Sequence, residues 1–368
     1  MENNTKSESA AAISVICFTD QGEMLCRQVV ACLYQNGIPA RGYRKGSNLG
    51  REAPAEPYCT LDVPAKITRI QESLETWTKE QFRLANGMIF IGAAGIAVRA
   101  VSQWVQDKFS DPPVVVMDEK GQFAIPILSG HVGLANDLAR LLGREMGAMP
   151  VITTATDVQG CFAVDVFARK RGLWISSRSL AKETSAALLA GEKVGFFSDF
   201  PIAGDVPDGC VLEQRCRRNI AVSVNVPTEE GTLCLVPKAV TLGIGCRRGI
   251  RADQIQEGVF RFLEQNRIFV QAVAQAASID VKQKEEGLSS FCQQMGWKLD
   301  FFSARELKGL AGAFSHSDFV EKTVGVGNVC ERAAVLGSGG KFEQLIQKKE
   351  QFDGVTVAAA LSDWKVIM

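Results

Sequence analysis

Short apolar runs alternate with stretches of helical periodicity along most of this chain. Residues 12–19, 88–91 and 114–118 have the length and composition of buried strands, and apolar residues at helical spacing follow the first two runs. Residues 114–118 and 123–128 flank a Gly-containing turn, which predicts a β-hairpin. This alternation predicts an α/β, multi-domain protein with open parallel or mixed sheets flanked by helices.

The pattern changes twice along the chain and so predicts its domains. Residues 11–158 are expected to form an N-terminal α/β domain, residues 159–236 a less regular middle subdomain, and residues 237–368 a C-terminal α/β domain. Residues 1–10 are polar and are expected to be a disordered tail. Residues 41–57 are polar and contain Gly and Pro, which favours a loop.

Charge and composition narrow the class of partner. Lys plus Arg and Asp plus Glu number 41 each, so no overall field attracts nucleic acid or an anionic membrane. No run of 18 apolar residues predicts a membrane span, and no signal peptide is visible, so we expect a cytoplasmic protein. The 11 cysteines form no CxxC pair and there are only two histidines, so no protein-bound metal is expected.

Gly92-Ala93-Ala94-Gly95 follows a predicted strand and opens a predicted helix. Small residues there would let a ligand reach backbone N–H groups, and a helix N-terminus favours anions. Arg99 could add a cation beside this turn. The segment is neither a Walker A loop nor GxGxxG, and a tight strand-to-helix turn without a ligand explains it equally well.

Two further turns carry polar groups at the ends of predicted strands. Ser129, Gly130 and His131 join a strand to a helix, and the histidine could titrate near neutral pH. A structural histidine is an equally good interpretation. Thr154 and Asp157 follow the next predicted strand, where a helix-capping turn is the favoured interpretation.

The C-terminal part contributes cations. Arg247 and Arg248 are adjacent after a predicted strand, and guanidinium groups suit bidentate binding of carboxylates. Lys282 at another strand end is a further candidate. Glu285 and Glu286 are interpreted as helix-start residues that the helix dipole favours. No Gly-x-Ser-x-Gly elbow and no HExxH motif is present, so serine-hydrolase and zincin chemistry are not indicated.

Seven segments occur in a fixed order along the chain: residues 92–99, 111–118 (DPPVVVMD), 128–136 (LSGHVGLAN), 150–157 (PVITTATD), 243–249 (GIGCRRG), 277–288 (ASIDVKQKEEGL) and 328–336 (NVCERAAVL). Taken together, they resemble the CbiG family of cobalamin biosynthesis. A departure is Leu134, where that family's pattern leads us to expect a second Gly before Ala-Asn.

The resemblance implies a hydrolase of the oxygen-independent, cobalt-early pathway. Its substrate would be cobalt-precorrin-5A, a tetrapyrrole bearing a δ-lactone. Water would open the lactone, and the methylated C20 would leave as acetaldehyde, giving cobalt-precorrin-5B. Cobalt would arrive within the substrate, so no cofactor is implied. The expected partners are the small-molecule tetrapyrrole and, transiently, neighbouring enzymes of the pathway, with no nucleic acid and no membrane.

The candidate residues suggest how such a reaction could run. Arg99, Arg247, Arg248 and Lys282 could bind the carboxylates of the macrocycle, and His131 could act as the general base toward water. Asp118 or Asp157 could orient the histidine, and the N–H groups near Gly92, Gly95 or Gly130 could stabilise an oxyanion. Ser129 and Thr154 would complete the substrate contacts.

Two other functions remain open at this point. A non-catalytic corrinoid carrier would need the same cations but no titratable group at His131. An α/β enzyme that binds a nucleotide or sugar phosphate would use the loop from Gly92 to Gly95.

Overall fold

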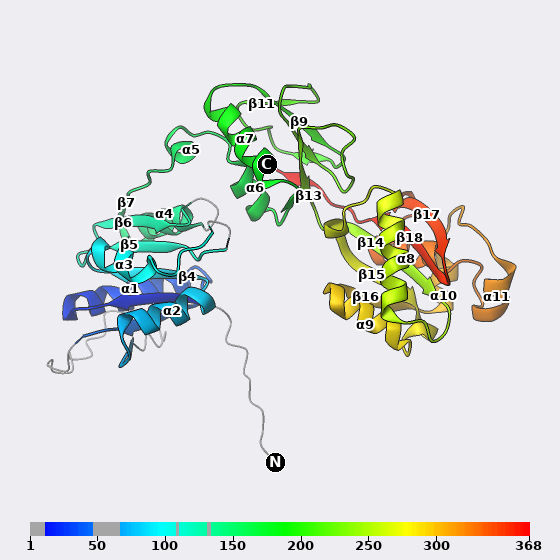
Figure 1. Cartoon of the computed structure of the whole chain (residues 1–368), viewed down its shortest axis with the longest axis horizontal. Coiled ribbons are helices and arrows are strands. Elements are labelled where there is room, and N and C mark those ends of the chain that lie inside the picture. Colours follow the sequence, from blue (N-terminus) through cyan, green and yellow to red (C-terminus); the bar gives the residue numbers. More distant parts are fainter. Residues whose placement is uncertain (1–11, 47–66, 108–109, 131–133) are drawn as a thin grey trace, which may run out of the picture. The chain divides into compact units, whose positions relative to one another are not determined.

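A computed structural model describes residues 12–46, 67–107, 110–130 and 134–368, and the expected tail lies outside them. The chain forms two compact units, Met1–Gly160 and Cys161–Met368. Both are layered α/β structures (Figure 1), which confirms the expected fold class.

The first unit is built on a seven-stranded sheet of order β3-β2-β1-β4-β5-β6-β7. All neighbouring strands are parallel except β5 and β6, which form the expected hairpin. Its elements are β1 (Ile13–Cys17), α1 (Asp20–Gln35), β2 (Ala40–Arg44), β3 (Ile67–Arg69), α2 (Leu74–Leu84), β4 (Gly87–Ile91), α3 (Ala94–Val101), β5 (Val114–Met117), β6 (Phe123–Leu128), α4 (Ala135–Met146), β7 (Met149–Pro150) and α5 (Ala155–Val158).

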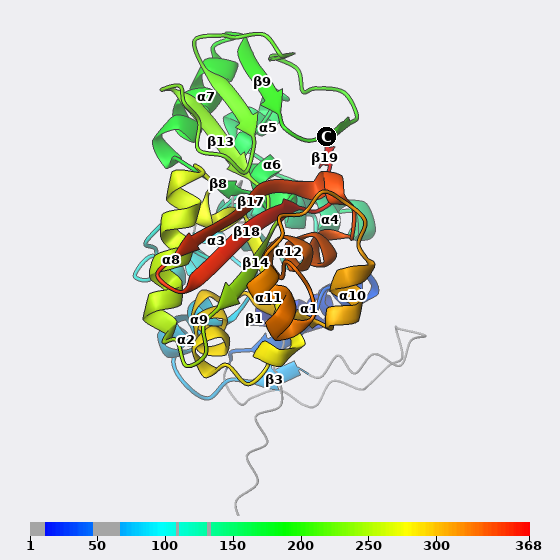
Figure 2. The ribbon, with the colours of Figure 1, turned by 90° about the vertical axis from the view of Figure 1, so that its right-hand side faces the viewer.

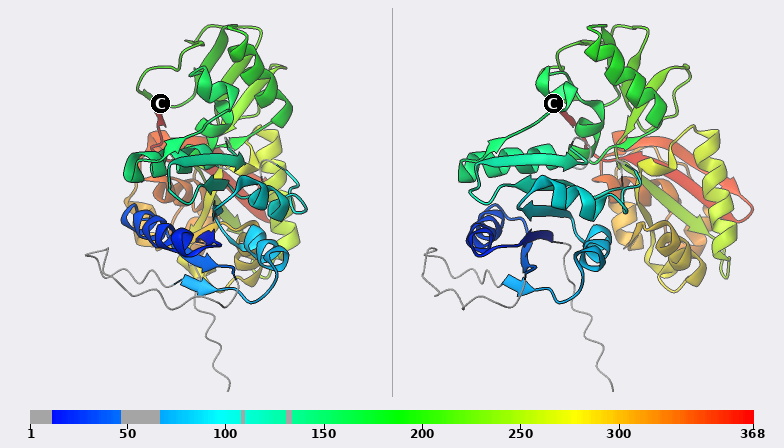
Figure 3. Two further views of the ribbon diagram at one scale, coloured as in Figure 1. Left: turned by 90° about the vertical axis from the view of Figure 1, so that its left-hand side faces the viewer. Right: turned by 60° about the vertical axis from the view of Figure 1, so that its left-hand side comes forward.

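Successive residues of the central strands enter different cores because strand side chains alternate between faces. Ile89 and Ile91 of β4 pack with α1 and α4, whereas Met88 and Phe90 pack with Trp77 of α2 and with α3. Figure 3 shows α1 and α2 on opposite sides of this sheet. Burial on both faces explains why these strands are continuous apolar runs in the sequence.

The expected loop at residues 41–57 is wrong in its first part, since β2 occupies Ala40–Arg44. Its sequence, ARGYR, has no apolar run, but its backbone pairs in parallel with β1 over five residues. Arg44 is held by Asp20 and Glu23 of α1 at 2.6 Å each. Tertiary pairing therefore forms a strand that local composition does not predict, and residues 47–57 lie outside the described part.

The middle part of the second unit has a five-stranded sheet of order β11-β9-β12-β13-β8. A separate two-stranded ribbon joins β10 to β19, the last strand of the chain. The elements are α6 (Val164–Lys170), β8 (Trp174–Ile175), α7 (Arg178–Leu189), β9 (Val194–Ser198), β10 (Ile202–Ala203), β11 (Cys210–Leu212), β12 (Asn219–Val222), β13 (Thr232–Val236) and β19 (Val366–Ile367).

The C-terminal part has a mixed sheet of order β16-β15-β14-β18-β17. Helices α8 and α12 lie on opposite sides of it (Figure 2). Its elements are β14 (Val240–Cys246), α8 (Ala252–Gln265), the 3₁₀ turns Val270–Ala272, Asp280–Lys282 and Phe342–Gln344, β15 (Val273–Ile279), α9 (Glu286–Met295), β16 (Lys298–Phe302), α10 (Ala304–Gly309), α11 (Asp318–Val324), α12 (Cys330–Ser338), β17 (Leu345–Phe352) and β18 (Val355–Leu361).

A glycine in β14 sets how closely α12 approaches this sheet. A Cβ atom at Gly243 would overlap the carbonyl oxygen of Cys330 in the first turn of the helix. The start of α12 therefore lies directly on the centre of the sheet.

Among the described residues, no helix is long and apolar enough to span a bilayer.

Candidate functional site

Strand directions divide the candidate residues of the first unit between two edges of its sheet. β1, β4 and β5 are parallel, so the Gly92–Gly95 turn and Asp118 follow carboxyl ends at one edge. β6 runs antiparallel to β5, with Leu128 paired to Val114, so Ser129 and Gly130 lie at the other edge. The structure therefore does not bring Asp118 to the Ser129 turn.

The turn from Gly92 to Gly95 lies beside the point where strand order reverses, between β1 and β4. Doubly wound sheets commonly bind ligands there. Gly92 has φ +148° and donates its N–H to the carbonyl of Met117 at 2.8 Å. The turn is largely exposed, and no side chain caps the start of α3.

Arg99 lies one turn into α3, and its guanidinium folds back toward the helix start. A Cβ atom built on Gly95 would stand 3.4 Å from Arg99 Nη2. Exposed backbone N–H groups and a cation are therefore close together, which is a suitable arrangement for an anionic group.

Asp118 closes the β5–β6 hairpin. Its Oδ1 accepts the Phe123 N–H at 2.8 Å, and its Oδ2 accepts the Lys120 N–H at 3.0 Å. Both carboxylate oxygens thus already bind backbone donors. This role in the turn is what the structure shows for Asp118.

At the other edge, the backbone and side chain of Asn136 together join three sequence segments. Its backbone N–H donates to the Gly130 carbonyl at 2.9 Å. Its Nδ2 donates to Thr154 Oγ1 at 2.9 Å and to Asp157 Oδ2 at 2.8 Å. Asn136 is 3% exposed, so these bonds are made away from water and are correspondingly important for the position of the turns.

Arg140, one helical turn after Asn136, completes what we call the Asn136 cluster: Gly130, Asn136, Arg140, Thr154 and Asp157. Arg140 Nη2 lies 2.5 Å from Asp157 Oδ1, and this hydrogen bond raises the pKa of Arg140. Sequence reasoning missed Asn136 and Arg140. The available signal was an amide at a helix start followed by Arg at i+4.

Ser129 anchors the same edge, with φ +52° and its Oγ donating to the Asp111 carbonyl at 2.9 Å. His131 lies outside the described residues. Leu134, the departure noted above, has φ +69° at the start of α4. A glycine would adopt this left-handed conformation without strain, which gives a physical reason to expect Gly there.

In the second unit, Arg247 and Arg248 follow the carboxyl end of β14. Both are exposed, and within the described part of the chain neither has a carboxylate in ion-pair range. The Arg247 backbone N–H donates to the Gly354 carbonyl at 2.9 Å, and its side chain lies against Gly354. Arg247 is therefore held against Gly354, and the side chains of both arginines are exposed and accessible to an anion.

Lys282 follows the neighbouring strand β15 and differs from the two arginines. Its Nζ lies 3.2 Å from Glu285 Oε2, and both side chains are mostly buried, at 18% and 11% exposed. Glu285 Oε1 also accepts the Gly249 N–H at 2.6 Å. Cys246 lies nearby, and burial raises the pKa of its thiol to about 11, so it is not a reactive thiolate at neutral pH.

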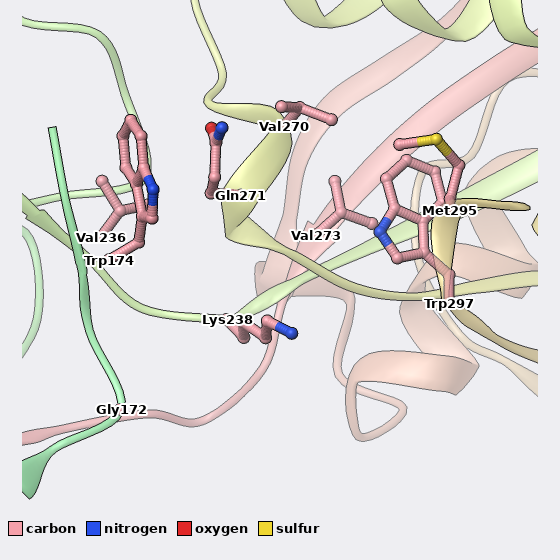
Figure 4. A pocket seen from close by; sticks show the side chains of 9 residues that line it. All are labelled: Gly172, Trp174, Val236, Lys238, Val270, Gln271, Val273, Met295 and Trp297. Atoms are coloured by element: carbon pink, nitrogen blue, oxygen red, sulfur yellow. The ribbon is translucent and has the colours of Figure 1, made fainter. Parts of the chain in front are cut away.

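A cavity of about 270 Å³ lies at the other end of the C-terminal sheet (Figure 4). It lies where β15 and β16 begin, and it is separated from Arg247 by the length of β14. None of the candidate residues lines it. Its lining residues are Gly172, Trp174, Val236, Lys238, Val270, Gln271, Val273, Met295 and Trp297.

Over the described ranges no three His, Cys, Asp or Glu side chains are grouped as metal ligands.

Three family models match successive parts of this α/β chain. They are cobalamin synthesis G N-terminal over residues 76–157, cobalamin biosynthesis central region over 162–237, and cobalamin synthesis G C-terminus over 240–360. The matches define its class as a cobalamin-biosynthesis protein of the G type.

Curated relatives identify the family more closely. The cobalt-precorrin-5A hydrolase of Salmonella typhimurium is 35% identical over 98% of this chain and 99% of its own. The cobalt-precorrin-5A hydrolase of Priestia megaterium is 32% identical over 76% of this chain and 79% of its own. This chain belongs to the family of cobalt-precorrin-5A hydrolases. A solved cobalamin biosynthesis protein G homolog from Sulfolobus solfataricus is 19% identical over 95% of this chain and 97% of its own, with a TM-score of 0.42.

Proposed function

We propose that this protein hydrolyses cobalt-precorrin-5A. Water opens the δ-lactone, and C20 leaves with its methyl group as acetaldehyde, giving cobalt-precorrin-5B. The observation that carries the proposal is the 35% identity to a relative of that name across nearly the whole of both chains. The relatives' names favour a hydrolase over a corrinoid carrier or a nucleotide-binding enzyme.

Arg247 and Arg248 are proposed to bind the substrate's carboxylates. The two arginines are adjacent at a strand end, and in the part of the chain that the structure describes no Asp or Glu forms an ion pair with either of them. Their charges are therefore available to the carboxylates of an anionic macrocycle. Replacing both with Ala should weaken binding by roughly 2–5 kcal/mol if substrate desolvates the pairs. An unchanged affinity in a titration with cobalt-precorrin-5A would remove these residues from the site.

In the first unit, His131 is proposed as the general base that activates water. Asp157 is the better candidate to orient it, because Asp157 lies in the Asn136 cluster with Gly130, whereas Asp118 lies at the other edge of the sheet. Ser129, Gly130 and Thr154 would hold the substrate at this edge. The turn formed by Gly92 and Gly95, with Arg99, lies at the other edge of the sheet and would bind a separate anionic group, which leaves the N–H groups near Gly130 as the candidates for stabilising the oxyanion.

Cobalt is proposed to enter only within the substrate, so the chain needs no cofactor of its own. The scattered cysteines and two histidines support this proposal. Elemental analysis of the substrate-free protein should find no stoichiometric metal, and about one tightly held zinc or iron per chain would contradict this proposal.

We further propose a cytoplasmic enzyme that contacts neighbouring pathway enzymes transiently.

The decisive experiment supplies purified protein with cobalt-precorrin-5A and measures acetaldehyde. A hydrolase releases one acetaldehyde for each molecule of product. A carrier would bind the substrate without releasing acetaldehyde, and a nucleotide-binding enzyme would show affinity for a nucleotide instead. Tight binding without acetaldehyde would therefore refute the proposed reaction.

A further inference from the structure

Glu285 makes contacts that its place in the sequence does not predict. It is the N-cap residue of α9, yet its side chain makes no capping hydrogen bond to that helix. It reaches instead to the Gly249 N–H at 2.6 Å, across 36 positions of sequence. The interpretation of Glu285 as a simple helix-start residue is therefore incomplete.

The same carboxylate also holds Lys282, so it joins two candidate anion-binding segments. Its two oxygens are divided between them, with Oε1 on the loop that carries Arg247 and Arg248, and Oε2 on Lys282 at 3.2 Å. These segments follow the carboxyl ends of β14 and β15, which are parallel neighbours.

Close packing limits where Glu285 can lie. A Cβ atom on Gly287, in the first turn of α9, would overlap the carbonyl oxygen of Ile250. The start of α9 is thus in direct contact with the loop after Gly249. The Glu285 side chain is only 11% exposed, so its contact with Lys282 is partly shielded from water, whereas the Gly249 N–H that it accepts lies in an exposed loop.

We infer that Glu285 is a positioning residue for substrate binding: it fixes the loop of Arg247 and Arg248 and neutralises Lys282, so that the two arginines are the cations that meet the substrate. This inference rests on the proposed function. It also changes the expected role of Lys282, whose charge is already compensated by Glu285 and is not free to bind a carboxylate.

Two substitutions separate the loop contact from the charge. Glu285→Ala removes the acceptor of the Gly249 N–H and releases the loop, so KM should rise about tenfold with kcat within about twofold of the parent. Glu285→Gln keeps an oxygen that can accept the Gly249 N–H but loses the negative charge. Its KM should stay within about twofold of the parent or fall, because Lys282 becomes available to the substrate.

Glu286 provides the matched control, since it is adjacent, acidic and exposed at the start of the same helix. Glu286→Ala should leave KM unchanged. Hydrogen exchange of a peptide covering residues 247–251 should be faster in Glu285→Ala than in the parent and unchanged in Glu286→Ala. This readout does not depend on the reaction.

The inference is overturned by an unchanged KM in Glu285→Ala, by a Glu285→Gln variant as impaired as the Ala variant, or by unchanged exchange at 247–251. If the Ala variant does not fold, the KM of the isosteric Gln variant alone decides: a tenfold rise overturns the inference. If the parent releases no acetaldehyde, the proposed function fails, and the exchange experiment still decides whether Glu285 holds the loop.

Discussion

Replacing Asn136 with Asp should destabilise the protein in a way that depends strongly on pH. The substitution exchanges a donor amide for a carboxyl group beside Asp157, whose Oδ2 lies 2.8 Å from the amide nitrogen it replaces. The site is shielded, because Asn136 is 3% exposed and the Asp157 side chain 12%. Two negative charges would therefore face each other with little water between them.

The size of the destabilisation is set by whichever of two states costs less free energy: both carboxyl groups ionised, or one of them protonated. Leaving both groups ionised about 3 Å apart costs about 5–6 kcal/mol at an effective dielectric constant of about 20. Holding a proton on one of them costs about 1.36 kcal/mol per pH unit above the ordinary aspartate pKa of about 3.9, which is about 4 kcal/mol at pH 7 and about 1.5 kcal/mol at pH 5. The cost of protonation is an upper bound, because Arg140 beside Asp157 also offsets part of the repulsion. The variant should therefore lose up to about 4 kcal/mol at pH 7 and clearly less at pH 5.

Scanning calorimetry of parent and variant at both pH values measures the difference. A double variant, Asn136→Asp with Asp157→Asn, is the control, because it restores one donor and one carboxylate at the contact. It should regain most of the stability at pH 7. A loss of equal size at pH 5 and pH 7, or a double variant as unstable as the single one, would refute charge repulsion as the cause.

Three other outcomes test separate features. His131→Ala should lower single-turnover acetaldehyde release by about 10²–10⁴ with little effect on binding; a variant of matched melting temperature that reacts at the parental rate would exclude it as the base. Glu331 is fully buried, and although burial alone would raise its pKa, N–H and O–H donors from Ser315 and Lys349 hold that pKa below 4.5. Glu331→Gln should cost about 2 kcal/mol at pH 7. Denaturation at falling pH should show this difference shrinking once the pH falls through the lowered pKa of Glu331, because the parent then loses the stabilising charge; a constant difference would contradict it. Deleting Val366–Met368 removes β19 and should speed hydrogen exchange in β10, and unchanged exchange there would mean that β19 does not support it.

The sequence predicts strands best where they are buried on both faces. β4 and β5 are continuous apolar runs because each residue enters one of two cores. β17 (LIQKKEQF) was not predicted, because it is an edge strand in which most side chains are at least partly exposed. Its partner β18 supplies the pairing that its own composition does not indicate.

Residues of the candidate site could be predicted only where the residue type and its neighbours in the sequence indicate binding of a ligand. Arg247 and Arg248 stand out as adjacent cations at a strand end. Asn136 and Glu285 do not, because their roles depend on contacts 18–36 residues away. The division of candidates between two sheet edges likewise follows from the reversal at β6, a property of the whole sheet rather than of either turn.

The path of the last strand gives the second unit an unusual organisation. The chain leaves the middle sheet after β13, builds the C-terminal sheet, and returns through β19 to pair with β10. Where it leaves and returns, the two segments are adjacent: Ser362 donates its N–H to the Ala239 carbonyl at 2.9 Å. The C-terminal sheet is therefore an insertion within the middle subdomain, with neighbouring entry and exit points, which is the arrangement that lets a domain be excised and the host chain rejoined by a short linker.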